Sequence, residues 1–136
     1  MKKLFLTILA TISLMSNLKE INEQELIKMQ KDGVVVIDIR TPGEWRQRGI
    51  IKGAYPIMFF TPQGQADVSN FMFELGHIVK DKNQPFIIYC AHANRTKELG
   101  NWLLNNMKFK KVYELKGGIE YGWIDKGLKT EAYIAK

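Results

Sequence analysis

PFIIYCAHANRT, residues 85–96, contains the single cysteine of this 136-residue chain, Cys90. Phe86 to Tyr89 is a short run of β-branched and aromatic residues, which is typical of a strand buried on both faces. The pattern then changes to the 3.6-residue period of an amphipathic helix that begins near Asn94 or Arg95. The apolar residues of that helix are Leu99, Trp102, Leu103 and Met107. We therefore expect Cys90 at the carboxyl end of a strand, facing the first turn of a helix.

A thiol in this position meets unpaired backbone N–H groups and the positive end of a helix dipole, which both favour an anion. A free cysteine titrates near ~8.5, and a helix N-terminus or a nearby cation can lower that value to about 3.5–7.5. Free cysteine is also often an inert, buried side chain. The place of Cys90 in a strand-to-helix loop favours a reactive thiolate over this structural alternative.

Helices and strands alternate along the rest of the chain. Capping boxes at 22–25 and 41–44 begin two predicted helices, which end near Met29 and Arg48. An apolar stripe over 66–79 predicts a third helix. The other predicted strands are at 34–39, 54–57 and 111–115, and a last short helix follows Gly117-Gly118 and ends near Trp123.

This alternation indicates one α/β domain over residues 20–133, with a mostly parallel central sheet of about 4–5 strands flanked by helices on both faces. In such sheets the functional residues lie beyond the carboxyl ends of the strands. This rule places Asp38, Arg40, residues 90–95 and residues 116–118 at one edge of the sheet. Asp38 and Arg40 are expected to support the site as a charged pair rather than to act catalytically.

Several segments resemble the rhodanese-like family of single-domain sulfurtransferases. The strand, cysteine, short loop ending in Asn94-Arg95-Thr96 and following helix resemble the family's active loop. Other matching segments follow in the family's order: Val35-Ile37-Asp38-Ile39-Arg40, Glu44-Trp45, Gly49-Ile50-Ile51-Lys52-Gly53-Ala54, Leu115-Lys116-Gly117-Gly118 and Trp123. The resemblance spans about Ile21 to Lys129. It departs at Ile50, where the family often has His, and at Ala93, where the family often has the Gly that tolerates positive φ.

The resemblance implies that Cys90 is the catalytic residue and carries a sulfane sulfur as a persulfide. The backbone around the loop would hold that sulfur and the substrate, with the substrate-binding residues Ala91, His92, Ala93, Asn94, Arg95 and Thr96. The donor would be a small anion, thiosulfate or polysulfide, and the acceptor would be cyanide, a thiol or a partner protein. No metal or organic cofactor is required. Two roles stay open for Arg95, which either orients an anionic donor or forms a salt bridge that stiffens the loop.

Loop length separates sulfur transfer from phosphoryl transfer. Cysteine phosphatases related to this fold have one residue more between cysteine and arginine than the four that separate Cys90 from Arg95. The shorter loop fits a single sulfur atom on Cys90, so a thiol phosphatase is disfavoured. A non-catalytic or sulfur-carrier rhodanese-like binding module is the alternative, and Ala93 supports it.

Residues 1–16 have the pattern of a secretory signal peptide. Lys2 and Lys3 precede a largely apolar stretch, Leu4 to Met15, and Ser13 or Ser16 offers a small residue for cleavage. A transmembrane helix needs about 17–25 residues, so no stable membrane span is expected. The predicted location is outside the cytoplasm, in a bacterial periplasm, and an uncleaved N-terminal membrane anchor is the alternative.

The formal net charge of +6 does not indicate a nucleic-acid-binding protein. Its lysines are spread along the chain rather than gathered with aromatic residues in a stripe. A single cysteine is also unusual for an exported chain of this size, since exported cysteines are usually paired in disulfides. The lone thiol therefore points to chemistry rather than to stabilisation.

Overall fold

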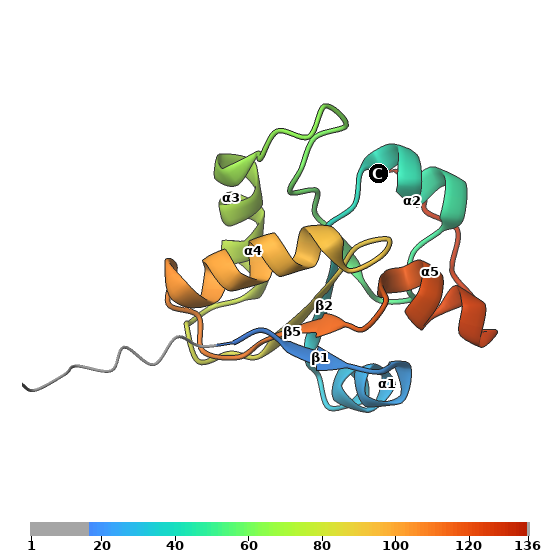
Figure 1. Cartoon of the computed structure of the whole chain (residues 1–136), viewed down its shortest axis with the longest axis horizontal. Helices are drawn as coiled ribbons and strands as arrows, with labels where there is room; N and C mark the ends of the chain where they lie inside the picture. Colours follow the sequence, from blue (N-terminus) through green and yellow to red (C-terminus); the bar gives the residue numbers. More distant parts are fainter. Residues whose placement is uncertain (1–16, 136) are drawn as a thin grey trace, which may run out of the picture.

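The computed structural model describes residues 17–135, so the expected signal peptide lies outside the described residues. A single sheet of five parallel strands forms the centre, in the order β1-β5-β4-β2-β3 (Figure 1). The strands are β1 (Lys19–Ile21), β2 (Val35–Asp38), β3 (Tyr55–Pro56), β4 (Phe86–Tyr89) and β5 (Val112–Leu115). This sheet confirms the predicted α/β class.

Helices cover both faces of the sheet. They are α1 (Glu23–Lys31), α2 (Pro42–Arg48), α3 (Val68–Ile78), α4 (Asn94–Asn105) and α5 (Gly118–Gly122), followed by a 3-10 turn, η1 (Ile124–Lys126). Figure 1 shows α3 and α4 on one side of the sheet and α1 on the other. The two N-terminal caps predicted from the sequence are present: Asn22 accepts a hydrogen bond from the Glu25 N–H, and Thr41 forms a complete capping box with Glu44.

Side-chain alternation along the strands divides the core into two layers. In β4, Phe86, Ile88 and then Cys90 belong to the layer beneath α3 and α4. Ile87 and Tyr89 belong to the opposite layer, which also contains Leu26 of α1 and Ile119 of α5. Since successive strand residues point to opposite faces, the residue that follows Tyr89 projects toward α4.

Three elements differ from the sequence-based expectation. Strand β1 was not expected, because two of its three residues are exposed and polar and its identity as a strand comes from backbone pairing with β5. Strand β3 has two residues instead of the predicted four. Helix α3 begins at Val68 rather than at residue 66, because Ala66 pairs with Phe60 in an isolated bridge and the Asp67 side chain caps the helix.

Candidate functional site

Cys90 directly follows β4 and lies at the carboxyl edge of the sheet. Cys90 is 1% exposed and belongs to the apolar layer beneath α4. The thiol sulfur lies 3.8 Å from the hydroxyl oxygen of Thr96 in the first turn of α4. The predicted strand–cysteine–helix arrangement is therefore present, with the sulfur covered by protein rather than exposed in the loop.

Ala93 sets the geometry of the loop between β4 and α4. It is the N-cap of α4, is buried, and has φ 64° and ψ 17°, in the left-handed region. Non-glycine residues rarely adopt this conformation, and the sequence departs from the family at this position. Within the described chain, no side chain caps this end of α4. Its first-turn N–H groups and dipole thus remain available to an anion carried by the loop.

The backbone of α5 holds the loop from the other side. The N–H of Ile119 donates to the carbonyl oxygen of Cys90 over 2.9 Å, and the N–H of Glu120 donates to the carbonyl oxygen of Ala91 over 3.1 Å. Gly118 allows this approach, because a Cβ there would lie 2.7 Å from the Cys90 oxygen and even closer to the Ala91 carbonyl group. The residues around Gly117-Gly118 thus reach the loop through main-chain atoms.

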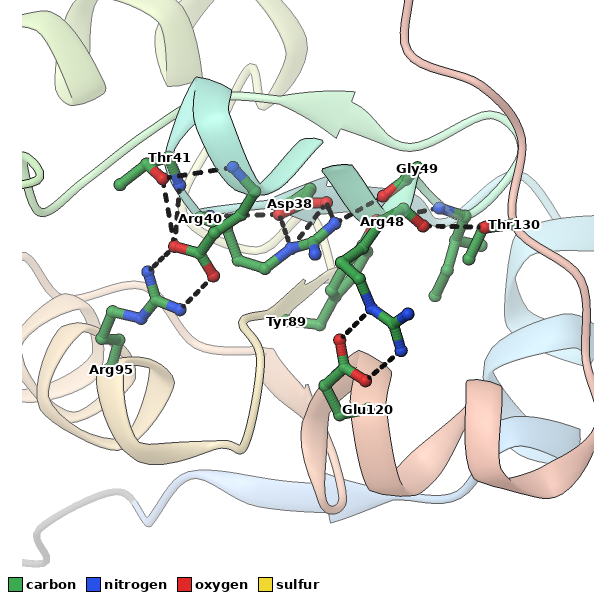
Figure 2. Close-up of polar contacts among 11 residues, drawn as sticks. Asp38, Arg40, Thr41, Arg48, Gly49, Tyr89, Arg95, Glu120 and Thr130 are labelled. Carbon is green, nitrogen blue, oxygen red and sulfur yellow. Dashed lines mark hydrogen bonds and ion pairs between the residues drawn. The ribbon is translucent and has the colours of Figure 1, made fainter. Parts of the chain in front are cut away.

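Arg95 forms a two-pronged ion pair with Glu44 of α2 (Figure 2). Its two terminal nitrogens lie 2.7 and 2.8 Å from the two carboxylate oxygens of Glu44. Burial acts to raise the pKa of Glu44, but the hydrogen bonds and positive charge of Arg95 hold that pKa below its usual value. The same hydrogen bonds raise the pKa of Arg95. Of the two roles considered for Arg95, the structure shows the ion pair, which ties the loop to α2.

Asp38 and Arg40 form a buried ion pair at the carboxyl end of β2. One terminal nitrogen of Arg40 lies 2.7 Å from an Asp38 oxygen and also 2.7 Å from the carbonyl oxygen of Gly49 (Figure 2). Tyr89 packs its ring against the Arg40 guanidinium, and its hydroxyl accepts a hydrogen bond from the Ile51 N–H. Burial, together with the charge of Asp38, raises the pKa of Tyr89 well above its ordinary value. These contacts join β2, β4 and the end of α2.

A second buried carboxylate, Glu114 of β5, lies behind Cys90 and was not found from the sequence. One carboxylate oxygen accepts a hydrogen bond from the Thr96 hydroxyl over 2.5 Å, and the other lies 2.6 Å from the Lys97 ammonium nitrogen. The hydrogen bond to Glu114 raises the pKa of Lys97. Glu114 is 1% exposed. The available signal was an acidic residue inside the predicted strand at 111–115, a placement that is uncommon unless the charge is paired.

The two remaining predicted loop residues, His92 and Asn94, have exposed side chains. His92 is exposed and its ring contacts that of Tyr121, with centroids 4.8 Å apart. Asn94 is exposed beside a pocket of about 610 Å³, and Cys90 is not part of the pocket wall. The wall consists of Thr41, Glu44, Phe60, Thr61, Pro62, Gly64, Asn94, Arg95 and Glu98. Lys116 is also exposed.

Over residues 17–135, no group of three or more His, Cys, Asp or Glu side chains is arranged to hold a metal ion. No helix within the same residues has the length and apolar character needed to cross a membrane.

Fold and site together define an α/β protein with one cysteine at the junction of a central strand and a helix. A model of the rhodanese-like domain matches residues 22–125 of the chain. This chain therefore belongs to the rhodanese-like domain family, which confirms the resemblance noted in its motifs.

One curated relative and two solved structures are among the proteins similar to this chain. The thiosulfate sulfurtransferase GlpE of Pseudoalteromonas translucida is 32% identical over 95 residues, covering 70% of this chain and 78% of the relative. The solution structure of the polysulfide-sulfur transferase homodimer of Wolinella succinogenes matches with a TM-score of 0.63 at 20% identity, covering 84% of this chain and 78% of that one. A Rhodopseudomonas palustris protein described as a possible tyrosine phosphatase matches with a TM-score of 0.62 at 25% identity, covering 84% and 85%.

Proposed function

We propose that this protein is a sulfurtransferase that carries a sulfane sulfur as a persulfide on Cys90. The observation that carries this proposal is the position of Cys90, between β4 and the first turn of α4, in a chain that belongs to the rhodanese-like family. Relatives named as thiosulfate sulfurtransferases support the same reaction class.

The reaction has two displacement steps. The Cys90 thiolate attacks the outer sulfur of thiosulfate, a new S–S bond forms, and the old S–S bond breaks as sulfite leaves with the electron pair. The product is a Cys90 persulfide whose negative charge sits on the outer sulfur. An acceptor such as cyanide or a thiolate then attacks that outer sulfur, and Cys90 leaves as the thiolate.

The loop backbone stabilises the persulfide anion. In the proposed mechanism, the N–H groups of residues 91–96 and the dipole of α4 stabilise the negative charge that develops on the outer sulfur. Such fixed donors contribute without reorganising during the reaction. The Arg95–Glu44 pair and the α5 hydrogen bonds keep these donors in position. Because Cys90 is 1% exposed, a donor reaches the sulfur only when neighbouring side chains move.

Intact-mass measurement tests the proposal directly. Purified protein incubated with thiosulfate or polysulfide should gain the mass of one sulfur atom, and subsequent cyanide or thiol should remove it. Cys90→Ser is the matched control, because it keeps the side-chain shape but has a hydroxyl that stays protonated at neutral pH. Loss of both adduct and turnover in this variant is expected. Full turnover in Cys90→Ser would refute the proposal.

A sulfur-carrier or non-catalytic module is the second candidate, favoured by the burial of Cys90 and the left-handed Ala93. A carrier should gain the sulfur from a donor but release it only to a partner protein, whereas an enzyme should turn over with small acceptors. The same mass assay, run with a panel of donors and acceptors, separates the two.

A thiol phosphatase is disfavoured by the short loop. Insertion of one glycine between Ala93 and Asn94 should reduce sulfur transfer, because misplacement of cradle donors by about 1 Å can cost roughly 100-fold. Unchanged transfer in the insertion variant would remove loop length as a reason to prefer sulfur over phosphate.

We also propose that the protein is exported, on the basis of the pattern in residues 1–16. Mature protein recovered from its native host should begin at about Leu14 or Asn17. Protein that keeps Met1 and sediments with membranes would instead support the anchored alternative.

A further inference from the structure

A pocket of about 610 Å³ lies beside the loop that follows Cys90. Its wall comes from three segments, namely the start of α2, residues 60–64 after β3, and the first two turns of α4. Pockets that bind small molecules usually have volumes of about 300–1,000 Å³, so this one has room for a small substrate. The two displacement steps of sulfur transfer leave the pocket without a role.

The apolar side of the pocket reaches the buried layer that contains Cys90. Phe60 lies in the pocket wall and packs against the cluster of buried residues to which Cys90 belongs. Arg95, also in the wall, directly precedes Thr96, whose hydroxyl oxygen lies 3.8 Å from the Cys90 sulfur. A molecule in the pocket is therefore next to the reactive loop, although Cys90 itself is not part of the wall.

The pocket wall contains three ionisable side chains, and two of them neutralise each other. The terminal nitrogens of Arg95 lie 2.7 and 2.8 Å from the two carboxylate oxygens of Glu44 (Figure 2). The third side chain is Glu98, which is exposed and forms no salt bridge within residues 17–135. With two carboxylates and one guanidinium, the wall has a net negative charge.

The cations nearest to Glu98 along the chain are already paired. Arg95 lies three positions earlier, on the same face of α4, but its charge is matched by Glu44. The ammonium nitrogen of Lys97 lies 2.6 Å from an oxygen of Glu114 and 3.2 Å from an oxygen of Glu20. The charge of Glu98 therefore acts on whatever enters the pocket.

We propose that this pocket binds the sulfur acceptor and that Glu98 makes it selective for aminothiols, which are thiols whose chain carries an ammonium group. The inference rests on the proposed sulfur transfer and adds the class of acceptor to it. The carbon chain of the acceptor lies against Phe60 and Pro62, and its ammonium group lies on the side of Glu98.

The chemical step remains a displacement at sulfur. The thiolate of the aminothiol attacks the outer sulfur of the Cys90 persulfide, and a new S–S bond forms. The S–S bond to Cys90 breaks, Cys90 leaves as a thiolate with the electron pair, and the product is the persulfide of the aminothiol. No oxidant, reductant or proton is consumed.

The alternative is a pocket that binds an anionic donor through Arg95. This use is disfavoured because the guanidinium already carries a two-pronged carboxylate partner, and because Glu98 repels an anion that enters beside it. The loop N–H groups are the donors available to an anion, and they belong to the Cys90 loop rather than to the pocket.

Single-turnover release of sulfur tests the selectivity. Protein loaded with one sulfur atom and freed of donor is mixed with low concentrations of cysteamine, mercaptoethanol or mercaptopropionate, which carry a positive, no or a negative charge. Loss of the added mass gives each rate. In Glu98→Gln, the cysteamine-to-mercaptoethanol ratio should fall by about two- to fivefold, and the mercaptopropionate-to-mercaptoethanol ratio should rise by a similar factor, as expected for an exposed charge. Comparing each acceptor between the wild type and the variant cancels its intrinsic reactivity.

Two controls separate charge at the pocket from other effects. Glu25→Gln removes an exposed carboxylate from α1, on the opposite face of the sheet (Figure 1), and should leave both ratios unchanged. Salt at about 1 M shortens the screening length to about 3 Å, so the wild-type preference for cysteamine should weaken.

Every other outcome overturns the proposal. Unchanged ratios in Glu98→Gln remove Glu98 as a determinant, and an equal change with all three acceptors indicates an altered loop. A preference that persists at high salt indicates shape rather than charge. If the variant does not fold, the salt dependence of the wild-type protein decides. Absence of any sulfur adduct refutes the proposed function, whereas an adduct released without regard to the charge of the acceptor refutes only this inference.

Discussion

Gly118→Ala should destabilise the protein through the contact between α5 and the Cys90 loop. The new Cβ would lie 2.7 Å from the Cys90 carbonyl oxygen, whereas real Cβ atoms essentially never approach within 3.0 Å. The obstructing atoms are backbone atoms that also accept hydrogen bonds from α5, so they cannot rotate away. Either α5 or the loop must move, and the bonds from Ile119 and Glu120 must lengthen.

Two terms contribute to the size of the effect. Gly118 has φ +65°, and placing an L-residue in the left-handed region costs about 1–2 kcal/mol. Overpacking a tight site typically costs a further ~1–3 kcal/mol. The free energy of unfolding, measured by urea denaturation, should therefore fall by about 2–5 kcal/mol.

Gly127→Ala is the matched control, and the difference in stability between the two variants measures the cost of the steric contact at Gly118. Gly127 has φ +82° and nothing within 4 Å of the position of an added Cβ, so its substitution should carry only the backbone cost. The Gly118 variant should be less stable than this control by at least about 1 kcal/mol, and its Cys90 should become more accessible to alkylating reagents. Equal stability of the two variants would refute the clash, and unchanged alkylation would refute the link to the loop.

The other predictions concern charged groups and backbone strain near the site. Asp38→Asn should lower the free energy of unfolding by about 3–5 kcal/mol, because it leaves the Arg40 guanidinium, which is 1% exposed, without an anion. Glu120→Gln breaks the pair with the exposed Arg48 and should lower the free energy of unfolding much less. Similar urea midpoints for the two variants would contradict this expectation. Ala93→Gly should raise the midpoint of thermal unfolding, because glycine adopts the left-handed conformation without strain; the free energy of unfolding should rise by up to about 1 kcal/mol. A lowered midpoint would show that the packing of the buried methyl group contributes more than the backbone strain costs. Glu44→Gln should lower the free energy of unfolding by about 1 kcal/mol at pH 7. The difference from the wild type should fade as the pH falls below about 4, because a carboxylate whose pKa is depressed in the folded protein loses its stabilising contribution when it is protonated. A difference that persists at pH 2–3 would contradict the role of the Glu44 carboxylate.

The centre of the fold was predictable because its residues have one dominant local signal. Strand β4 spans the predicted residues Phe86–Tyr89, and α4 begins at Asn94 as expected. Both predictions rest on apolar periodicity, because elements that pack into the buried layers of a parallel sheet need apolar residues at regular positions in the sequence. The complete capping box at Thr41 was also predictable, since its hydrogen bonds join residues three positions apart.

Features that depend on distant partners were not predictable. Strand β1 exists because its backbone pairs with β5, nearly a hundred residues away along the chain, and its own side chains are mostly polar and exposed. The ion pair between Glu44 and Arg95 and the hydrogen bond between Thr96 and Glu114 likewise join residues far apart in sequence. Motif spacing identified Arg95 and Thr96 but gave no means of assigning their partners.

The attachment of the Cys90 loop to α5 has a consequence for how this protein can change over evolution. The hydrogen bonds from Ile119 and Glu120 end on carbonyl oxygens of Cys90 and Ala91, and main-chain atoms are the same whatever side chain a residue carries. Mutations at the exposed His92 therefore leave this anchorage intact, while Gly118 admits no larger residue without displacement. Side chains at exposed loop positions such as His92 can therefore change during evolution while the backbone contacts that hold Cys90 stay the same.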